Sequence, residues 1–411
     1  MKICQVSFGL SPISSQDIDA SNSVIRNLAN QFISMGHSVD ILSPMDTNID
    51  DQPFHIIPIP IPKIISNSGL LKEAYYSISS AIFFLSKMKR DDYDIIHFHG
   101  PAVASLCAIV ARIYGIPTIY TTHNPNLTVD RKIECNNKIM LFKELNESHL
   151  PFLNSICSIY SERFAFKSVD KIVAVSNTQR DNIIKYFSVN PSRIEYIPNG
   201  IDTKMFNLNF DHSHLMKLHN LKNEKIVLCL ARLAPYKNQL TLVKSILHIL
   251  DFIDNIRFIF VGPISKPFLE YYNEIDRFIE SHNLKKYVIF TGSVNSSLIP
   301  AYYSLADIVV LPSLSEGMPL VLLEAMGCGK AIVASSIEPN LELAKNGSEM
   351  LFVDPLNPQE ISASIIKILR DEELKGSLEI SSRKTVVKYF DWTNIARQTL
   401  SLYDELKKSR R

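Results

Sequence analysis

The sequence lacks the features that mark several common classes of protein. Its six cysteines are scattered, with no C-x-x-C pair and no histidine cluster beside them. This argues against a structural zinc site or a disulfide framework and favours reduced, mostly buried thiols. No window offers about eighteen uninterrupted apolar residues, and the opening MKICQVSFGL reads as a strand and not as a signal peptide. We therefore expect a cytoplasmic protein without a membrane-spanning helix.

The chain also lacks an excess of charge of either sign. Lys and Arg number 43 and Asp and Glu 42, for a formal net charge of +1. Without a basic stripe or a recognition motif, the sequence predicts no nucleic-acid partner. No G-x-G-x-x-G follows the first apolar run, which disfavours a dinucleotide-dependent oxidoreductase.

Short β-rich apolar runs alternate with longer segments of helical periodicity along nearly all of the 411 residues. This alternation predicts an α/β fold with parallel sheets covered by helices on both faces, and the length favours two domains. Polar, irregular sequence over 198–219 predicts a hinge at about residue 205. The expected strands are 93–97, 117–121, 171–175, 225–231, 257–261, 288–291, 307–311 and 331–334. The expected helices are 101–114, parts of 138–168, 239–250, 268–282, 298–305, 319–326 and one that ends near 407.

The strongest chemical signal is EGMPLVLLEAMGCGK, which begins at Glu316. Pro319 lies near the first position of a helix, so the free N–H groups of Gly317, Met318 and Leu320 could meet an anion or sugar hydroxyls. Glu324 lies in a helix that is apolar nearly all round, so its carboxylate must be paired or hydrogen-bonded. It could form a structural ion pair or cap bond, or accept hydrogen bonds from two vicinal ribose hydroxyls; the spacing favours neither.

A second signal is R-L-A-P-Y-K-N from Arg232 to Asn238. Arg232 follows a strand that reads as buried, and Lys237 precedes a helix. Two cations beside a helix N-terminus favour one bound anion. A solvated loop lysine is the simpler alternative for Lys237.

Three histidines follow or end strands of the first half. His123 lies just after the expected strand 117–121, and His97 and His99 alternate along IIHFHG. Most such histidines are structural. Of the pair, His99 is the better candidate to line a binding cleft.

Taken in order, these clusters resemble glycosyltransferase family 4, the large retaining group with the GT-B fold. The resemblance covers the whole chain. It rests on Glu-x7-Glu at Glu316 and Glu324 and R-x4-K at Arg232 and Lys237, which together are specific. Supporting motifs are Thr-x-His at His123, VAVSN at 173–177, PNGID at 198–202 and F-x-W at 390–392.

The resemblance implies a GT-B architecture of two Rossmann-like domains whose parallel sheets face across a cleft. Residues 1–205 would form the acceptor-side domain and 206–387 the donor-binding domain, with a C-terminal helix in 388–411 crossing back to the first.

By position, the resemblance implies roles for individual residues. Arg232 and Lys237 would hold the donor diphosphate in place of a metal ion, so no metal and no cofactor is expected. Glu324 would hold the ribose hydroxyls, and Glu316 would lie near the donor sugar. Gly317, Met318, Pro319 and Ser313 would border the sugar pocket. His123 would contact the sugar or the departing phosphate.

The implied reaction is retaining transfer of a hexose from a nucleotide-diphosphate sugar to a saccharide or lipid-linked acceptor, in polysaccharide, lipopolysaccharide or glycolipid assembly. The leaving diphosphate would help to deprotonate the acceptor on the same face of the sugar.

One departure from the family pattern concerns the loop after the first strand. Family members commonly carry paired glycines there, whereas residues 9–23 contain one glycine. Ser21 and Asn22 could cap the following helix and donate to phosphate instead, the loop could be specialised for the acceptor, or the contact could be lost.

Other functions of the same fold stay open, namely a nucleotide-sugar epimerase, a sugar phosphorylase or a non-catalytic partner subunit. Residues 70–90 (LLKEAYYSISSAIFFLSKMKR) are basic and apolar. They predict either a peripheral contact at the inner membrane face or, as is commoner, an ordinary amphipathic helix packed on the sheet.

Overall fold

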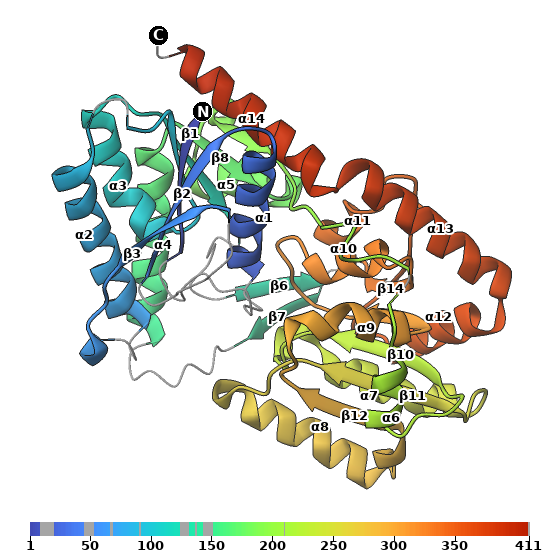
Figure 1. Ribbon diagram of the computed structural model, residues 1–411. Coiled ribbons are helices and arrows are strands. Elements are labelled where there is room, and N and C mark those ends of the chain that lie inside the picture. The colour runs from blue at the N-terminus through green and yellow to red at the C-terminus, as the bar shows by residue number, and fades with distance from the viewer. Residues whose placement is uncertain are drawn as a thin grey trace. The chain divides into compact units, whose positions relative to one another are not determined.

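The chain divides into two compact units, each built on its own parallel sheet (Figure 1). The first unit comprises Met1–Val129, Leu150–Gly200 and Trp392–Arg411, and the second comprises Asp130–His149 and Ile201–Asp391. The computed structural model describes residues 1–8, 20–44, 53–65, 69–89, 92–123, 131–135, 138–142, 151–208 and 210–409.

The sheet of the first unit has seven parallel strands in the order β3-β2-β1-β4-β5-β8-β9. Its strands are β1 (Lys2–Val6), β2 (Ser38–Pro44), β3 (His55–Ile59), β4 (Ile95–Phe98), β5 (Thr118–Thr122), β8 (Lys171–Ala174) and β9 (Ile194–Tyr196). Its helices are α1 (Ala20–Ser34), α2 (Gly69–Lys87), α3 (Pro101–Ile113), α4 (Pro151–Ser168), α5 (Asn177–Phe187) and α14 (Trp392–Ser409).

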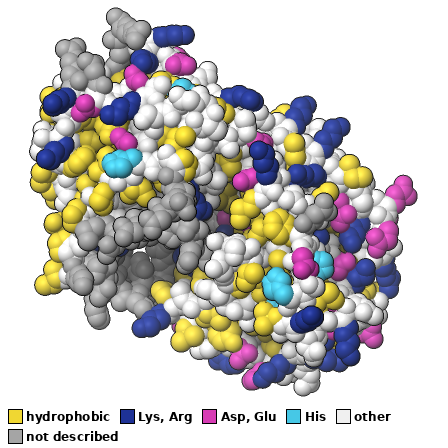
Figure 2. Space-filling view, viewed as in Figure 1, with side chains coloured by type: hydrophobic (Ala, Val, Ile, Leu, Met, Phe, Trp, Pro, Cys, Tyr) yellow, Lys and Arg dark blue, Asp and Glu magenta, His cyan; other side chains and the backbone are white. Residues whose placement is uncertain are grey.

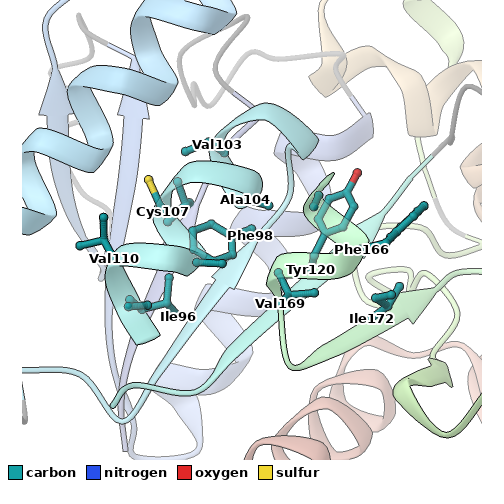
Figure 3. Packing of buried hydrophobic residues seen from close by; sticks show 14 of the residues in the cluster. Ile96, Phe98, Val103, Ala104, Cys107, Val110, Tyr120, Phe166, Val169 and Ile172 are labelled. Carbon is teal, nitrogen blue, oxygen red and sulfur yellow. The ribbon is translucent and has the colours of Figure 1, made fainter. Parts of the chain in front are cut away.

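Helices cover both faces of this sheet, because alternate side chains of each strand point to opposite sides. Cys4, Val6 and Phe98 face α2, α3 and α4, which bring Tyr76, Phe84, Val103, Cys107 and Phe166 into one core. Figure 3 shows Cys107 and Val110 of α3 beside Phe98 and Ile96 of β4. The opposite face packs α1 and α14 on Ile3 and Ile41.

The sheet of the second unit has six parallel strands in the order β12-β11-β10-β13-β14-β15. Its strands are β10 (Lys225–Leu230), β11 (Ile256–Val261), β12 (Val288–Gly292), β13 (Ile308–Leu311), β14 (Ala331–Ser335) and β15 (Leu351–Val353). The helices are α6 (Ser213–Leu218), α7 (Gln239–Leu250), α8 (Leu269–Ser281), α9 (Ile299–Leu305), α10 (Leu320–Gly327), α11 (Glu338–Leu341), α12 (Pro358–Arg370) and α13 (Glu372–Tyr389). An antiparallel hairpin, β6 (Arg131–Cys135) and β7 (Lys138–Phe142), belongs to the same unit.

Two of the passages of the chain from one unit to the other, at 200–201 and at 391–392, lie within the described residues. On the side of the second unit, Ile201 N–H donates to the Phe390 carbonyl over 2.8 Å, and Thr203 Oγ1 lies 2.5 Å from Asp391 Oδ2. On the side of the first unit, Gly200 packs so closely on Trp392 that a Cβ at position 200 would lie 2.5 Å from the indole ring. The hinge predicted near residue 205 therefore lies a few residues beyond the observed division at Gly200.

The expected elements agree with the structure to within one or two residues in most places, and α7 agrees at both ends. The helix expected in parts of 138–168 is α4, whereas Lys138–Phe142 of the same segment is strand β7. His55–Ile59 was not among the expected strands. This strand, β3, contains Pro58 and lies at the edge of the sheet, where a missing N–H is tolerated.

Candidate functional site

The second sheet has a point at which its winding reverses. From β10 the chain proceeds outward through β11 and β12, and from β13 it proceeds in the opposite direction through β14 and β15. Such a reversal leaves a crevice at the carboxyl ends of the two central strands, where ligands of α/β sheets bind. Arg232 and Lys237 follow β10, and Glu316 and Glu324 follow β13. The structure thus places both predicted clusters at one topological switch point.

Lys237 and Glu316 form an ion pair at this point. Lys237 Nζ lies 2.6 Å from Glu316 Oε1, and the two side chains are 19% and 9% exposed. A charge-assisted hydrogen bond of this length holds the ammonium at a defined position. Because an ammonium carries three donors, Lys237 can keep Glu316 and still bind an anion.

The turn that ends at Lys237 is fixed by a buried asparagine that directly follows the R-x4-K pair. Asn238 has a left-handed backbone with φ of 57°, which lets the 3₁₀ turn Pro235–Lys237 lead directly into α7. Its Nδ2 donates to the carbonyls of Pro312 and Pro355, 3.1 and 2.6 Å away. The loop after β10 is therefore tied to the segments that follow β13 and β15.

Arg232 lies at the start of the same loop and is exposed. Its carbonyl accepts a hydrogen bond from Gln239 Nε2 over 2.9 Å, which fixes its backbone. The neighbouring Gly262 approaches this backbone closely, since a Cβ there would lie 2.2 Å from the Ala231 oxygen. The main chain at Arg232 is thus held while its guanidinium stays accessible to a ligand.

Glu324 is held by a tyrosine from the preceding helix. Tyr303 of α9 places its hydroxyl 2.7 Å from Glu324 Oε2 and 3.2 Å from the Val321 carbonyl. Although Glu324 keeps some accessible surface, dense packing around its carboxyl group raises its pKa to about 7, and donation from Tyr303 opposes that rise. The expectation that this carboxylate is hydrogen-bonded is met, through one of its two oxygens.

The remaining residues of the expected sugar pocket lie close to the two glutamates along the chain. Gly317 is half-buried, whereas Met318 and Pro319 are buried, and Pro319 is the N-cap of α10. Ser313 is fully buried. Its hydroxyl has no hydrogen-bond partner among the described residues, and its carbonyl accepts from Ser335 Oγ.

In the first unit the winding reverses between β1 and β4, and the three histidines lie at and beyond the ends of β4 and β5. His99 Nδ1 lies 3.1 Å from His123 Nε2, and their rings stack with centroids 5.4 Å apart. His99 is only 1% exposed, whereas His123 is half-buried. His99 therefore lies behind His123 as seen from solvent.

His97 has a structural environment. Its Nδ1 lies 2.6 Å from the hydroxyl of Tyr403 in α14, and its Nε2 lies 2.7 Å from Thr121 Oγ1. Burial lowers the pKa of His97 to about 3 and the pKa of His99 well below its usual value, so both rings are neutral at pH 7. One of the two facing nitrogens of His99 and His123 must then donate and the other accept.

Ser21 and Asn22 do not cap α1 as expected. The helix already begins at Ala20, so both residues lie in its first turn, where the side chain no longer occupies the N-cap position. Asn22 is buried. Residues 9–19, which hold most of the loop without paired glycines, lie outside the described residues.

The sequence prediction gave no role to the Tyr303 and Asn238 side chains, and a third such group lies in the first unit. Glu162 of α4 is buried, with both carboxyl oxygens 3.1 Å from the Tyr120 hydroxyl. Burial raises its pKa to about 8. None of these pairings has a signal in the sequence, because the partners lie 21 to 117 residues apart.

The described residues contain no group of three or more His, Cys, Asp or Glu arranged to hold a metal ion. The described cysteines, namely Cys4, Cys107, Cys157, Cys229 and Cys328, are free thiols. Among the helices of this part of the chain, none combines the length and the hydropathy needed to cross a bilayer.

Two protein-family models match the chain. The model described as "Glycosyltransferase Family 4" matches residues 21–205, and the one described as "Glycosyl transferases group 1" matches residues 213–385. Together they cover most of both units.

Individual relatives match over nearly their full length at low identity. The chain is 26% identical to the UDP-Gal:alpha-D-GlcNAc-diphosphoundecaprenol alpha-1,3-galactosyltransferase of Escherichia coli, over 84% of this chain and 83% of the relative. It is 23% identical to the MMP alpha-(1->4)-mannosyltransferase of Mycolicibacterium hassiacum, over 93% of each.

Solved structures show the same fold. Sucrose-phosphate synthase from Thermosynechococcus elongatus superposes with a TM-score of 0.79 at 21% identity, over 99% of each chain. Anabaena HepE in complex with UDP-glucose superposes with a TM-score of 0.72 at 18% identity, over 98% of this chain and 100% of that one. The expected GT-B class, with two Rossmann-like α/β domains, is confirmed.

Proposed function

We propose, on the premise that this chain belongs to glycosyltransferase family 4, that it transfers a hexose from a nucleotide-diphosphate sugar with retention of configuration. The chain is a glycosyltransferase of the GT-B type. The observation that carries the finer proposal is the joint placement of Lys237, Glu316 and Glu324 at the switch point of the second sheet.

The donor diphosphate would be held by Lys237 and Arg232. The bonds of Asn238 and Gln239 hold the backbone of this loop in place before the donor arrives, which reduces the ordering that accompanies binding. Two positive charges beside the start of α7 supply the compensation that a divalent metal gives in other sugar transferases, and we propose that transfer needs no metal.

The nucleoside and sugar would be held by the two glutamates. Glu324 has one oxygen bonded to Tyr303, and its accessible surface suits a further contact with ribose hydroxyls. Glu316 is oriented by Lys237 and would accept from hydroxyls of the donor sugar. Gly317, Met318, Pro319 and Ser313 would shape that pocket.

Chemistry then depends on leaving-group stabilisation. As the bond between the anomeric carbon and the diphosphate lengthens, negative charge grows on the phosphate oxygen, and Lys237 and Arg232 stabilise it. That oxygen takes the proton of the acceptor hydroxyl as the hydroxyl attacks from the same face, so configuration is retained. His123, oriented by His99, would contact the sugar or the departing phosphate.

The acceptor class follows from the relatives alone. The Escherichia coli relative is named for a diphosphoundecaprenol acceptor, and the Mycolicibacterium relative is named for the alpha-(1->4) transfer of mannose. We propose a saccharide or lipid-linked acceptor for this chain, in the assembly of a polysaccharide, lipopolysaccharide or glycolipid.

The first test is a thermal-shift screen of the purified protein against UDP, GDP, ADP and dTDP and their sugars, with and without EDTA. A ligand of the native state raises the melting temperature by mass action. We expect one nucleotide family to raise the melting temperature, and EDTA should not change this shift. Lys237→Ala should abolish the shift. The control Lys222→Ala, at an exposed lysine of the same unit, should leave it intact. A shift that requires a divalent metal, or one that survives Lys237→Ala, would contradict the proposed site.

A further inference from the structure

The outer side of α2, α3 and α4, called here the outer helical face, carries large apolar side chains where a water-facing surface is expected. These helices pack side by side on one side of the first sheet. Their inner residues form the core, so their opposite sides face outward. A helix on the surface of a water-soluble domain normally places polar residues there.

The outward stripe of α2 is apolar over four turns. Leu71, Tyr75, Ile78, Ile82 and Leu85 follow one another at spacings of four, three, four and three residues, and each is 38–58% exposed. This is the period of one helix face, and it is separate from the inward stripe that contains Tyr76 and Phe84. The helix is therefore apolar on two sides, and only one of them is covered by the protein.

The neighbouring helices continue the same surface. Leu106, Ile109 and Ile113 are 38–71% exposed on α3, and Tyr160 and Phe164 are 65% and 54% exposed on α4. Single exposed apolar residues are ordinary, but a contiguous set on three packed helices marks a contact surface. Figure 2 shows hydrophobic side chains gathered on the side of the first unit where α2 lies.

Exposed charge on this face is positive. Lys87, Lys89, Arg112, Arg163 and Lys167 are exposed on or directly after the three helices. Among the described carboxyl groups of the same stretches, Glu162 is buried, and Glu73, Asp92 and Asp170 are half-buried. The chain as a whole has 43 basic and 42 acidic residues, so this face carries an excess of exposed positive charge that the whole chain does not have.

From this combination we propose that the outer helical face binds the surface of an anionic lipid bilayer. The apolar stripe enters the boundary between headgroups and acyl chains, the two tyrosines lie at the level of the headgroups, and the lysines and arginines contact lipid phosphates. A second copy of the chain fits less well, because a symmetric contact would bring these cations against their own equivalents.

Such a surface gives the enzyme access to an acceptor that is anchored in lipid. This use rests on the proposed function, whereas binding to the bilayer does not. The experiment therefore measures binding without turnover.

The test is co-sedimentation of the full chain with vesicles of phosphatidylcholine and phosphatidylglycerol at a molar ratio of about 7:3, and with vesicles of phosphatidylcholine alone. We expect the chain to bind the anionic vesicles. Its partition coefficient should be roughly tenfold or more lower with the neutral vesicles, and likewise lower with the anionic vesicles at high salt. The double variant Ile78→Ser/Ile82→Ser should lose roughly tenfold or more of the partition coefficient.

The matched control is Ile380→Ser/Val387→Ser, which removes two exposed apolar side chains, 72% and 42% exposed, from one helix of the second unit. It should bind vesicles as the unchanged chain does. Because all four side chains lie outside the cores, both double variants should keep the melting temperature and the nucleotide-induced shift of the unchanged chain. That shift reports on the proposed donor site separately, so either hypothesis can fail alone.

Three results would overturn the proposal: no binding of the unchanged chain to anionic vesicles, equal loss in both double variants, or equal binding to neutral vesicles. A fourth is a dimer in light scattering that Ile78→Ser/Ile82→Ser dissociates while vesicle binding is absent. That outcome would assign the outer helical face to contact between two copies of the chain.

Discussion

The ionisation of Glu324 should control how tightly the nucleotide binds. Its pKa is raised to about 7 by burial, whereas acceptance of two ribose hydroxyls requires the carboxylate. About nine tenths of the groups are ionised at pH 8 and about one tenth at pH 6. We therefore expect the Kd of the nucleoside diphosphate to be level above pH 8 and about tenfold weaker at pH 6, a loss of about 1.4 kcal/mol in binding free energy.

Isothermal titration calorimetry between pH 5.5 and pH 8.5 measures this profile. Glu324→Gln is the matched variant, because it keeps the size of the side chain and cannot ionise. Its affinity at pH 8 should be lower than that of the unchanged protein, and its profile should lose the step near pH 7. The nucleotide phosphate titrates in the same range, but it does so equally in both proteins, so the ratio of the two Kd values isolates Glu324.

Tyr303 provides a second, directional check on the same carboxylate. Its hydroxyl donates to Glu324 Oε2 and so favours the charged form. In Tyr303→Phe the midpoint of the binding profile should move to higher pH. If Glu324→Gln shows the same step as the unchanged protein, or if Tyr303→Phe moves the midpoint to lower pH, the assignment of Glu324 to nucleotide binding is wrong.

Three further predictions concern stability and can be measured by denaturant unfolding. Gly200→Ala should cost about 1–3 kcal/mol, because its Cβ would lie 2.5 Å from the buried Trp392 ring; an unchanged midpoint would refute this packing. Arg383→Ala should lower the free energy of unfolding by about 2–4 kcal/mol, because the Arg383 guanidinium donates to the carbonyls of Thr203, Phe206 and Gly327. Arg383→Lys should retain only part of that stability. Glu162 is protonated in the fold below its pKa of about 8, whereas in the unfolded chain it ionises near its usual value. The fold therefore loses stability as pH rises from 5 to 8, by up to about 1.4 kcal/mol per pH unit, and Glu162→Gln should remove this contribution; parallel pH profiles of the two proteins would contradict it.

Periodicity located the regular elements because it is a local property. The helix 239–250 shows its apolar spacing along the chain and ends where the sequence becomes polar at Asp251, and both features are visible in the sequence. The strand β7 was missed because the short apolar run KIMLF fits either a helix or a strand when its partner is unknown. Its identity depends on pairing with β6, which is a contact between segments.

The site was likewise predictable where it depends on local motifs and not where it depends on contacts between distant residues. Motif spacing identified Arg232, Lys237, Glu316, Glu324 and His123 as candidates. It did not show that Lys237 would pair with Glu316, because the two residues lie 79 positions apart. Nor did it show that Tyr303 would satisfy Glu324, or that His99 would lie behind His123.

The sequence by itself determined the α/β class, the family and the residue types available for donor chemistry, since these follow from local patterning and from motifs of fixed spacing. Only the tertiary structure decided which charges meet, which carboxyl groups keep their protons near neutral pH and which side of α2 is left uncovered. Those outcomes depend on desolvation and on contacts between distant segments, and both exist only after the strands have been ordered into a sheet and the helices have packed on it.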